Sequence, residues 1–463
     1  MIDGEVLERV LSEARGRGAE FAEVYAEDRR NTGVSFDDGR VEGVSSGRDR
    51  GAGVRVVNGA TTGYAHTSDL TESGLLAAAR AAADAAGTGR EGEVVVAMQP
   101  RVDRRAGTVS VEPMSVTKSS RADMLREVDE IARGVAASVT QVSASVSDSR
   151  RSVLIANSDG VWVTDDVTRV LFRVGVVADG DLGMQTGAES IGHTGGWEMF
   201  DRYSVGDLAV LAAEQAVRKL SARPAPSGQL PVVIAQGTGG VLFHEACGHG
   251  LEADHVAKDA SVYAGRLGEQ VASPLVTLVD DGTVDGEWGT RAFDDEGVPT
   301  QRNVLIENGV LVDYMWDHVR ARDARRSRSG NGRRQDYASL PMVRMTNTFV
   351  LAGRDDPADI ISATEYGVFV AKLGGGSVNT ASGDFVFGMR EAYLIEGGKI
   401  TEPLREGNLI GNGPQVLCDI DMLGNDFAMG GPGTCGKDGQ GVPVGTGQPT
   451  LRVSSMTIGG TAA

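Results

Sequence analysis

The sequence predicts an α+β protein in which two amino-terminal α/β units precede a large, mostly β carboxy-terminal domain. Up to about residue 221, segments with helical spacing of apolar residues take turns with segments that alternate apolar and polar residues. Beyond Leu230, short β-branched runs are separated by glycine turns. Glycine supplies 64 of the 463 residues, whereas a share of roughly 7% is usual, and this excess is typical of a turn-rich protein.

The first unit, residues 1–87, is expected to hold a helix, a group of strands and a second helix. Apolar residues near its start recur at helical spacing: Val6, Leu7, Val10, Leu11 and Ala14. The segments FAEVYAED, NTGVSFDDGRVEGVSSG and GAGVRVVNGATTGYAH then alternate apolar and polar residues around Asp-Gly and Asn-Gly turns, which predicts hairpins. An alanine-rich helix is expected from about Thr71 to Gly87.

The second unit spans residues 88–221, and the third domain spans residues 222–463. A polar connector (88–117) precedes a long helix from Ser119, two long strands and a helix that starts at Ser204 with Asp207 three residues later. The segment 222–228 is rich in Ala, Pro and Gly and is interpreted as a linker. Half-buried strands are then predicted at SPLVTLVDDGTVDG, RNVLIENGVLVDYM, EAYLIEGGKITEP and PTLRVSSMTIGG.

Charge and composition exclude several classes of protein. The formal net charge is −19, which argues against a nucleic-acid partner because phosphate contacts need clustered Lys and Arg. No apolar run reaches the ~18 residues of a membrane span, and the first helix is acidic rather than a signal peptide. The 3 cysteines are too few for a disulfide scaffold. We therefore expect a cytoplasmic protein with thiols that are free or bound to metal.

One motif carries metal chemistry: His244-Glu245-Ala246-Cys247-Gly248-His249, or H-E-x-x-x-H. In the familiar zinc helix the second histidine stands at i+4, on the same face as the first. Here it stands at i+5, so the two imidazoles would lie about 140° apart on an ideal helix. The spacing predicts either a π-bulge or an unwound helix at His249. Gly248 and Gly250 flank His249 and would tolerate that departure.

A third metal ligand is needed, and several residues are candidates: Cys247, Glu252, Asp254, His255, Cys418 and Cys435. Cys435 lies in a glycine-dense loop that can approach another element, whereas Cys418 is interpreted as a packed thiol in a buried strand. With three protein ligands, a zinc site keeps one position open for water, and Glu245 would act as the general base. The competing interpretation of an isolated H-E-x-x-x-H is a set of polar residues without catalytic function.

Motifs along nearly the whole chain resemble those of the TldD/PmbA (TldD/TldE) zinc metallopeptidases. They are FAEVYAEDRR, RGAGVRVVNGATTGYAHTSDL, HEACGHGLEADHV, GNGRRQDYASLPMVRMTNTF, GGGSVNTASGDFVFGMREAYLIEGGKI and GTCGKDGQGVPVGTGQPTLRVSSMTIGG. The resemblance implies that His244, His249 and Cys435 bind Zn²⁺ and that Glu245 is the catalytic base. Because the chain keeps the His-Glu pair, it resembles the active TldD-type subunit. Cys247 is not a ligand in the family pattern.

The resemblance also implies a three-part architecture, hydrolysis of unfolded or leader-type peptides, and a TldE/PmbA-like paralogue as partner in a heterodimer. A homodimer is the other possibility. Two further functions stay open at this point. One is a hydrolase that tailors an amide in a peptide-derived small natural product, and the other is a non-catalytic assembly subunit with structural zinc.

Weaker features each have two interpretations. Seven arginines between Arg320 and Arg334 could steer anionic peptide ends towards the site, or could belong to a solvated mobile loop. The segment from Arg344 to Phe349 offers hydrogen-bond donors for a substrate backbone, or is a polar strand end. Gly374, Gly375 and Gly376 would permit close approach of a peptide, or form a tight turn.

Overall fold

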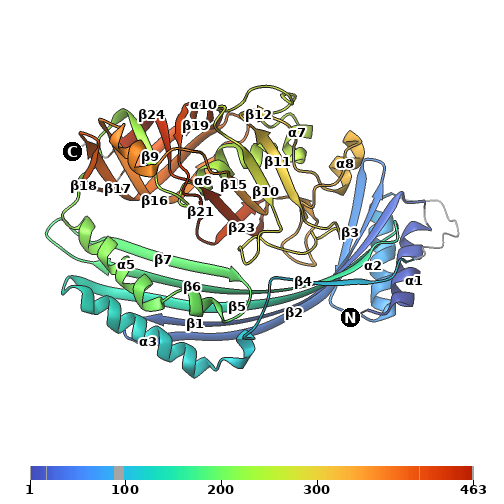
Figure 1. The fold of residues 1–463 in the computed structure, drawn as a ribbon. Helices are drawn as coiled ribbons and strands as arrows, with labels where there is room; N and C mark the ends of the chain where they lie inside the picture. Colours follow the sequence, from blue (N-terminus) through green and yellow to red (C-terminus); the bar gives the residue numbers. More distant parts are fainter. Residues whose placement is uncertain (1, 17, 88–97, 406, 461–463) are drawn as a thin grey trace.

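The structure is a computed structural model that describes residues 2–16, 18–87, 98–405 and 407–460. It has the α+β architecture expected from the sequence. A long amino-terminal sheet lies beneath a carboxy-terminal domain that consists largely of strands (Figure 1). Among the described residues, no helix has both the length and the apolar character that a membrane span requires.

One seven-stranded sheet contains the strands of both amino-terminal units, in the order β3-β2-β1-β5-β6-β4 with β7 also paired to β6. The β4–β6 pair is parallel, and the other pairs in this sheet are antiparallel. Its strands are β1 (Phe21–Asp37), β2 (Arg40–Asn58), β3 (Thr61–Thr67), β4 (Val102–Ala106), β5 (Val139–Asn157), β6 (Trp162–Ala178) and β7 (Gln185–Thr194). The two units therefore share a sheet, and the domain boundaries at residues 87 and 221 stay a prediction.

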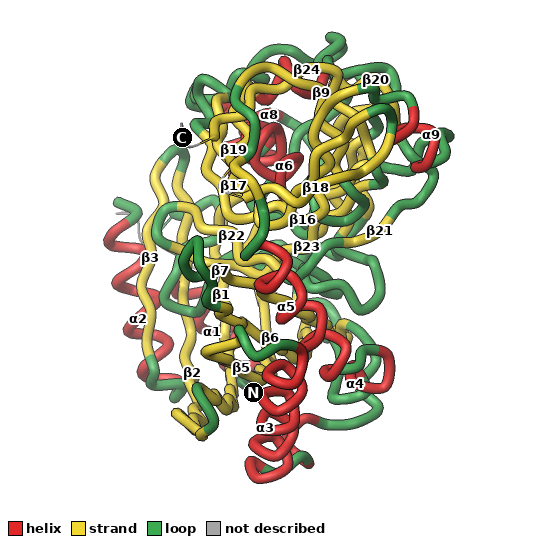
Figure 2. Tube along the Cα trace, turned by 90° about the vertical axis from the view of Figure 1, so that its left-hand side faces the viewer, coloured by secondary structure: helices red, strands yellow, loops and turns green. Residues whose placement is uncertain are grey.

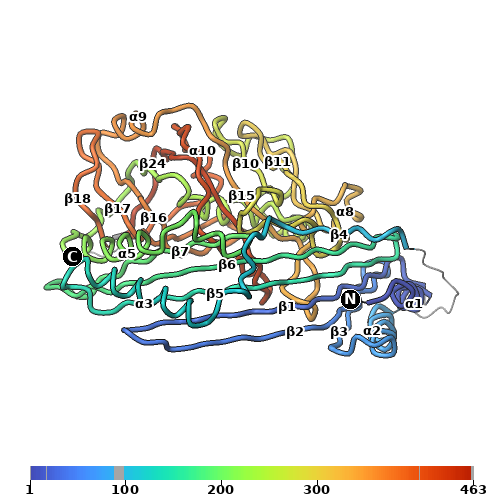
Figure 3. The backbone as a smooth tube through the Cα atoms, turned by 60° about the horizontal axis from the view of Figure 1, so that its bottom comes forward, coloured from blue at the N-terminus to red at the C-terminus, as the bar shows by residue number. Residues whose placement is uncertain are grey.

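Four helices cover this sheet in two groups, one towards each end (Figure 3). The first group is α1 (Gly4–Arg15) and α2 (Glu72–Ala85), and the second is α3 (Lys118–Val135) and α5 (Val205–Lys219). The Ser204 side chain accepts a hydrogen bond of 3.1 Å from the backbone N–H of Asp207, which confirms the predicted start of α5. The short helices η1 (Pro113–Ser115) and α4 (Met199–Arg202) lie in the connections.

The carboxy-terminal domain contains a closed five-stranded barrel. Its strands follow the order β16-β9-β24-β19-β17, and pairing of β17 with β16 closes the ring. The barrel strands are β9 (Gly228–Ile234), β16 (Tyr366–Val378), β17 (Asp384–Glu396), β19 (Gly407–Asn412) and β24 (Leu451–Gly460). β18 (Lys399–Arg405), β8 (Arg223–Pro224) and β20 (Ile420–Leu423) extend it.

A second sheet of this domain has the order β12-β11-β10-β15-β23-β21, and β22 pairs with β23. Its strands are β10 (Leu278–Asp281), β11 (Arg302–Glu307), β12 (Val310–Leu311), β15 (Asn347–Val350), β21 (Ala428–Met429), β22 (Gly433–Lys437) and β23 (Gln440–Gln448). The smaller elements are β13 (Gly332–Arg333), β14 (Met342–Val343), α7 (Ala253–Ala257), α8 (His318–Ala324), α9 (Pro357–Ser362) and α10 (Gly413–Cys418). Figure 2 shows the barrel strands, β9, β16, β17, β19 and β24, above the amino-terminal sheet.

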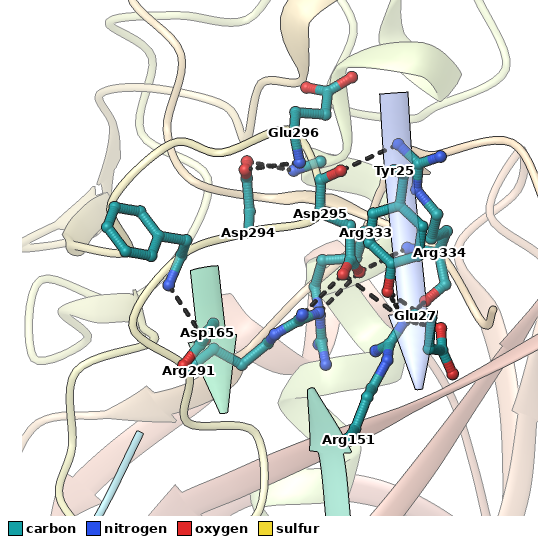
Figure 4. Close-up of polar contacts among 12 residues, drawn as sticks. Tyr25, Glu27, Arg151, Asp165, Arg291, Asp294, Asp295, Glu296, Arg333 and Arg334 are labelled. Atoms are coloured by element: carbon teal, nitrogen blue, oxygen red, sulfur yellow. Dashed lines mark hydrogen bonds and ion pairs between the residues drawn. The ribbon is translucent and has the colours of Figure 1, made fainter. Parts of the chain in front are cut away.

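A buried polar network joins the carboxy-terminal domain to the sheet below it (Figure 4). From the sheet, the guanidinium of Arg151 donates to the hydroxyl of Tyr25 at 2.5 Å and lies 3.1 Å from a carboxylate oxygen of Glu27. From the domain above, the Arg291 guanidinium makes two contacts of 2.6 Å with Asp295. The same Asp295 carboxylate lies 3.6 Å from the guanidinium of Arg151, so an ion pair links the sheet to the domain above it.

The arginine-rich segment contributes to this network, so its interpretation as a solvated loop is wrong for its last two members. Arg333 and Arg334 are 1% and 0% exposed. Arg334 forms an ion pair with Glu23 of β1, which Arg55 of β2 also contacts at 2.9 Å. Buried guanidinium groups need such partners, and here the partner carboxylate stands 311 positions away in the sequence.

Two connecting segments also differ from expectation. The connector 88–117 contains β4, which pairs with β6, while residues 88–97 lie outside the described part of the chain. The expected linker 222–228 contains β8, which pairs with β18, and its Ala222 and Ala225 are buried. The linker and the described part of the connector are therefore each anchored to a sheet.

Candidate metal centre

The H-E-x-x-x-H motif lies where a helix changes pitch. α6 (Gly240–Phe243) continues into one turn of π-helix, η2 (His244–Gly248), and then into a 3₁₀ turn, η3 (His249–Leu251). A π turn takes more residues per turn than an α-helix, so it brings positions i and i+5 to one face. The centroids of the two imidazole rings are 4.9 Å apart. Of the two alternatives predicted from the spacing, the π-bulge is confirmed.

The glycines beside His249 serve packing rather than backbone freedom. Gly248 has ordinary helical dihedral angles, φ −52° and ψ −53°. A Cβ atom there would lie 2.3 Å from Sδ of Met345, and one at Gly250 would lie 2.7 Å from the ring of Tyr263. The predicted reason for these glycines, tolerance of an irregular backbone, is therefore wrong. The motif needs them because other side chains pack directly against it.

A hairpin brings Cys435 to the two histidines. Strands β22 and β23 are joined by the two-residue turn Asp438-Gly439, whose φ values of 48° and 77° suit a tight hairpin. Sγ of Cys435 lies 3.3 Å from Nε2 of His249. One ligand atom each from His244, His249 and Cys435 lie within 4.8 Å of one another, and all three residues are buried. The chain thus gathers two imidazoles and one thiol from segments 186 positions apart.

The electrostatics of this group suit a cation. Burial alone would raise the pKa of Cys435, but hydrogen bonds and charge from His244 and His249 lower it to about 4. The thiolate is the form that ligates metals. Nδ1 of His244 is buried without a hydrogen-bond partner among the described residues. An unpartnered buried nitrogen beside a thiolate and a second imidazole fits a bound metal ion, and this donor set is typical of Zn²⁺.

Glu245 stands beside this group without belonging to it. Its carboxylate lies 3.9 Å from Nε2 of His249, and its side chain keeps 20% of its surface exposed. It also lines a cavity of about 910 Å³ that reaches the three candidate ligands. The carboxylate thus lines the same cavity as the three candidate ligands.

The cavity lies between the two parts of the molecule. Its walls include Ala188, Glu189 and Ser190 of β7 from the amino-terminal sheet, and residues of β16 and β22 from the domain above. The expected triple-glycine segment, Gly374 to Gly376, is part of the wall. Across this wall, the ammonium of Lys372 in β16 forms an ion pair with Glu189 of β7.

A second buried cluster, formed by Glu252, Asp254 and Lys437, contacts the ring of His249 at Nδ1. Oε2 of Glu252 lies 3.1 Å from Nδ1 of His249. The ammonium of Lys437 donates to Glu252 at 2.8 Å and to Asp254 at 2.7 Å. Burial would raise the pKa of Glu252, but His249 and Lys437 lower it to about 2. Glu252, Asp254 and His255 also have the spacing of metal ligands, yet the Lys437 ammonium lies between the first two carboxylates.

The other two thiols lie away from the metal-binding group. Cys247 is buried, its Sγ donates to the carbonyl of Phe243 at 3.1 Å, and burial raises its pKa to about 12. It therefore stays a neutral thiol that packs in the core. Cys418 was predicted to be packed in a buried strand, and this prediction is wrong. It ends the short helix α10 and is exposed, whereas the buried residues of that helix are Gly413, Val416 and Leu417.

The segment after the arginine-rich region holds protein groups rather than a substrate. The Arg344 guanidinium donates to the carbonyl of Cys435 at 2.5 Å and to that of Gln440 at 3.2 Å. The hydroxyls of Thr346 and Thr348 donate to Asp280 at 2.8 and 2.9 Å. Lys437 was not singled out from the sequence; the neighbouring Asp-Gly turn predicts a hairpin, but it does not indicate the carboxylate partners of the lysine.

Comparison with known proteins agrees with this geometry. Residues 227–460 match the PmbA/TldA metallopeptidase C-terminal domain, residues 22–86 match domain 1, and residues 112–220 match the central domain. A Metalloprotease TldD homolog of Haemophilus influenzae is 41% identical over 452 residues, which cover 96% of this chain and 94% of the relative. The chain belongs to the PmbA/TldD metallopeptidase family.

Two further comparisons extend over nearly the whole chain. A Zinc metalloprotease TldD homolog of Saccharolobus solfataricus is 25% identical, over 98% of this chain and 99% of the relative. The crystal structure of TldE from Thermococcus kodakarensis has a TM-score of 0.76 at 19% identity, over 98% of this chain and 99% of that one. The last comparison shows that the fold is shared, and it extends over both the sheet and the domain above it.

Proposed function

We propose that this chain is a zinc-dependent peptidase that hydrolyses amide bonds of unfolded or leader-type peptides. The observation that supports this proposal most strongly is that His244, His249 and Cys435 lie within 4.8 Å of one another, with Glu245 beside them. The π turn brings the two histidines together. We propose these three residues as the metal ligands and Glu245 as the catalytic base. The named zinc metalloprotease among the relatives supports the choice of Zn²⁺.

The protein's own groups divide the work as follows. Zn²⁺, when bound, supplies a Lewis acid that polarises the substrate carbonyl and lowers the pKa of water towards ~7. The Glu245 carboxylate accepts a proton from the attacking water and returns it to the nitrogen of the leaving amine. Glu252 holds His249 through Nδ1, so that Nε2 faces Cys435 and the cavity.

Two observations favour a catalytic site over a structural zinc in an assembly subunit. A structural site is normally closed by four protein ligands, whereas the group described here offers three. It also opens on a cavity of about 910 Å³, which is within the range of small-molecule and substrate sites. Hydrolysis of an amide in a peptide-derived small natural product stays as the alternative, because the same site chemistry would serve it.

The proposed partner is a TldE/PmbA-like paralogue in a heterodimer, with a homodimer as the other arrangement. The shared fold of TldE supports this, since a paralogue of the same shape can pair with this chain. Light scattering of the chain alone and after co-expression with its paralogue distinguishes the two. We also propose a cytoplasmic location, which the three free thiols support because a reducing compartment keeps thiols unpaired.

Zinc removal and return test the proposed activity. Protein loaded with Zn²⁺ is expected to cleave a quenched, unstructured peptide, and chelation should abolish cleavage while the circular dichroism stays native. Re-addition of Zn²⁺ should restore it. Cleavage that persists at the same rate in metal-free protein would exclude the proposal. Peptides retained by Glu245→Gln protein, identified by mass spectrometry, would then define the natural substrate.

A further inference from the structure

A second cavity adjoins the proposed active site. It has a volume of about 410 Å³ and extends over the face of the amino-terminal sheet that looks towards the carboxy-terminal domain. It shares Ala188, Glu189, Ser190 and Arg390 with the cavity at the metal-binding group. The two cavities are therefore neighbours that share part of their walls.

The floor of this second cavity is a row of polar side chains on adjacent strands. Ser35 of β1 pairs with Ser145 of β5, which pairs with Arg173 of β6, which pairs with Ser190 of β7. Side chains in such a cross-strand row lie about 5 Å from one another. Their neighbours Phe36, Ala144 and Val174 point to the opposite face, where they pack in the core under α3 and α5. Strand alternation therefore directs the hydroxyls and Arg173 into the cavity.

Two guanidinium groups face this cavity without a carboxylate partner. Arg173 rises from the floor, and Arg390 of β17 belongs to the domain above. Both are exposed, and no ion pair or hydrogen bond of either side chain occurs within the described part of the chain. Burial and the charge of Arg390 lower the pKa of nearby Lys219, while the charge of Glu391 acts in the opposite direction.

Among the described residues, the two acidic residues of the same cavity form no ion pair with either arginine. Glu189 is already paired with Lys372. Glu42 belongs to β2, which is three strand spacings from β6 in the sheet order, a separation of about 14 Å. In a chain with a net charge of −19, two unpaired arginines and four serines in one cavity form a local anion-binding environment.

We infer that this second cavity is a subsite for a carboxylate of the peptide substrate, held by Arg173 and Arg390. The carboxylate is either the terminal group or an acidic side chain, since both present the same pair of oxygens to a guanidinium. The inference rests on the proposed peptidase function. It assigns the anion-binding role first considered for the Arg320–Arg334 region to two arginines far from that region in the sequence.

Binding to a catalytically inactive protein tests the subsite apart from the activity. Full-length Glu245→Gln protein loaded with Zn²⁺ is titrated into fluorescently labelled unstructured peptides, and affinity is read by anisotropy. One peptide carries a glutamate and a free carboxyl terminus, a second has an amidated terminus, and a third has glutamate replaced by glutamine. Arg173→Gln and Arg390→Gln are compared with Arg302→Gln, an exposed arginine of β11 outside both cavities.

Loss of the recognised carboxylate is expected to weaken binding about tenfold or more, because charge-assisted hydrogen bonds are lost. Either cavity substitution should weaken binding of the carboxylate peptide by a similar factor and abolish the preference over its neutral analogue. Arg302→Gln should change neither. Amidation and the glutamine peptide show which carboxylate is held. Equal affinity of all three peptides for the Glu245→Gln protein that keeps both arginines would overturn the inference. Unchanged affinity in both arginine variants, or the absence of saturable binding, would do the same.

Discussion

The carboxylate of Glu252 lies 3.1 Å from Nδ1 of His249, so the opposite ring nitrogen faces the thiol of Cys435 at 3.3 Å. A carboxylate on the outer nitrogen of a ligating histidine fixes the orientation of the ring and raises its basicity. Lys437 anchors the same carboxylate from the strand that also holds Cys435. Two proposed ligands are therefore oriented by one buried ion pair.

Substitution Glu252→Gln is expected to weaken Zn²⁺ binding by about 10- to 100-fold, because a neutral amide supports the imidazole less well. Competition with a chromogenic chelator measures the affinity without any substrate. Glu307→Gln, at an exposed carboxylate of β11, is the control and should leave the affinity unchanged. An unchanged affinity in Glu252→Gln would show that the carboxylate has no influence on the metal.

Cys435 and Cys418 are the two cysteines outside the H-E-x-x-x-H motif, and comparing their alanine variants tests the third metal ligand. Cys435→Ala is expected to lose bound zinc, whereas Cys418→Ala, at an exposed helix end, should keep about one zinc per chain. Elemental analysis after gel filtration gives the metal content. Zinc that is retained in Cys435→Ala but lost in Cys247→Ala would move the third ligand into the motif itself.

Part of this site could be predicted from the motif alone. The i+5 spacing of the histidines predicted either a π-bulge or an unwound helix, because helix geometry leaves few ways to bring such residues together, and the structure has the π-bulge. Cys435 was assigned by family resemblance, since local sequence left five other candidates open. Glu252 and Lys437 are 185 positions apart, and nothing in the local pattern of either residue indicates an ion pair across that separation.

The arginine-rich segment shows the converse limit. A Ser, Gly and Arg run has the composition of a solvated loop, but Arg334 is fully buried against Glu23 of the first strand. Burial of a guanidinium depends on a partner that only the tertiary fold supplies. The segment around Cys418 also differs from its local pattern, because an apolar run that favoured a strand forms a short helix instead.

Removal of one member of the buried network should destabilise the fold. Arg334→Leu leaves Glu23 without one of its two guanidinium partners, and loss of a buried partner typically costs about 3–5 kcal/mol. Urea denaturation followed by circular dichroism should show a lower midpoint. Arg302→Leu, on an exposed strand position, should unfold like the wild type. Equal midpoints for both variants would mean that the network contributes no stability.

Glu287 predicts a dependence of stability on pH. Burial raises its pKa from 4.5 to about 7. Between these values the folded chain binds a proton that the unfolded chain has released, so the free energy of unfolding falls as the pH rises. Glu287→Gln removes this pH-dependent decrease in the free energy of unfolding. The melting temperature of the variant should therefore be higher than that of the wild type at pH 8 and nearly the same at pH 4.5. A constant difference at both pH values would contradict the raised pKa.

The most direct test of the account is the paired measurement of zinc content and peptide hydrolysis in Glu245→Gln. The carboxylate stands beside the three proposed ligands rather than among them, so the variant should keep about one zinc per chain. An amide cannot accept the proton of the attacking water, and hydrolysis of an unstructured peptide should fall by roughly 10²- to 10⁴-fold. A zinc-loaded variant that hydrolyses the peptide at the wild-type rate would contradict the central claim.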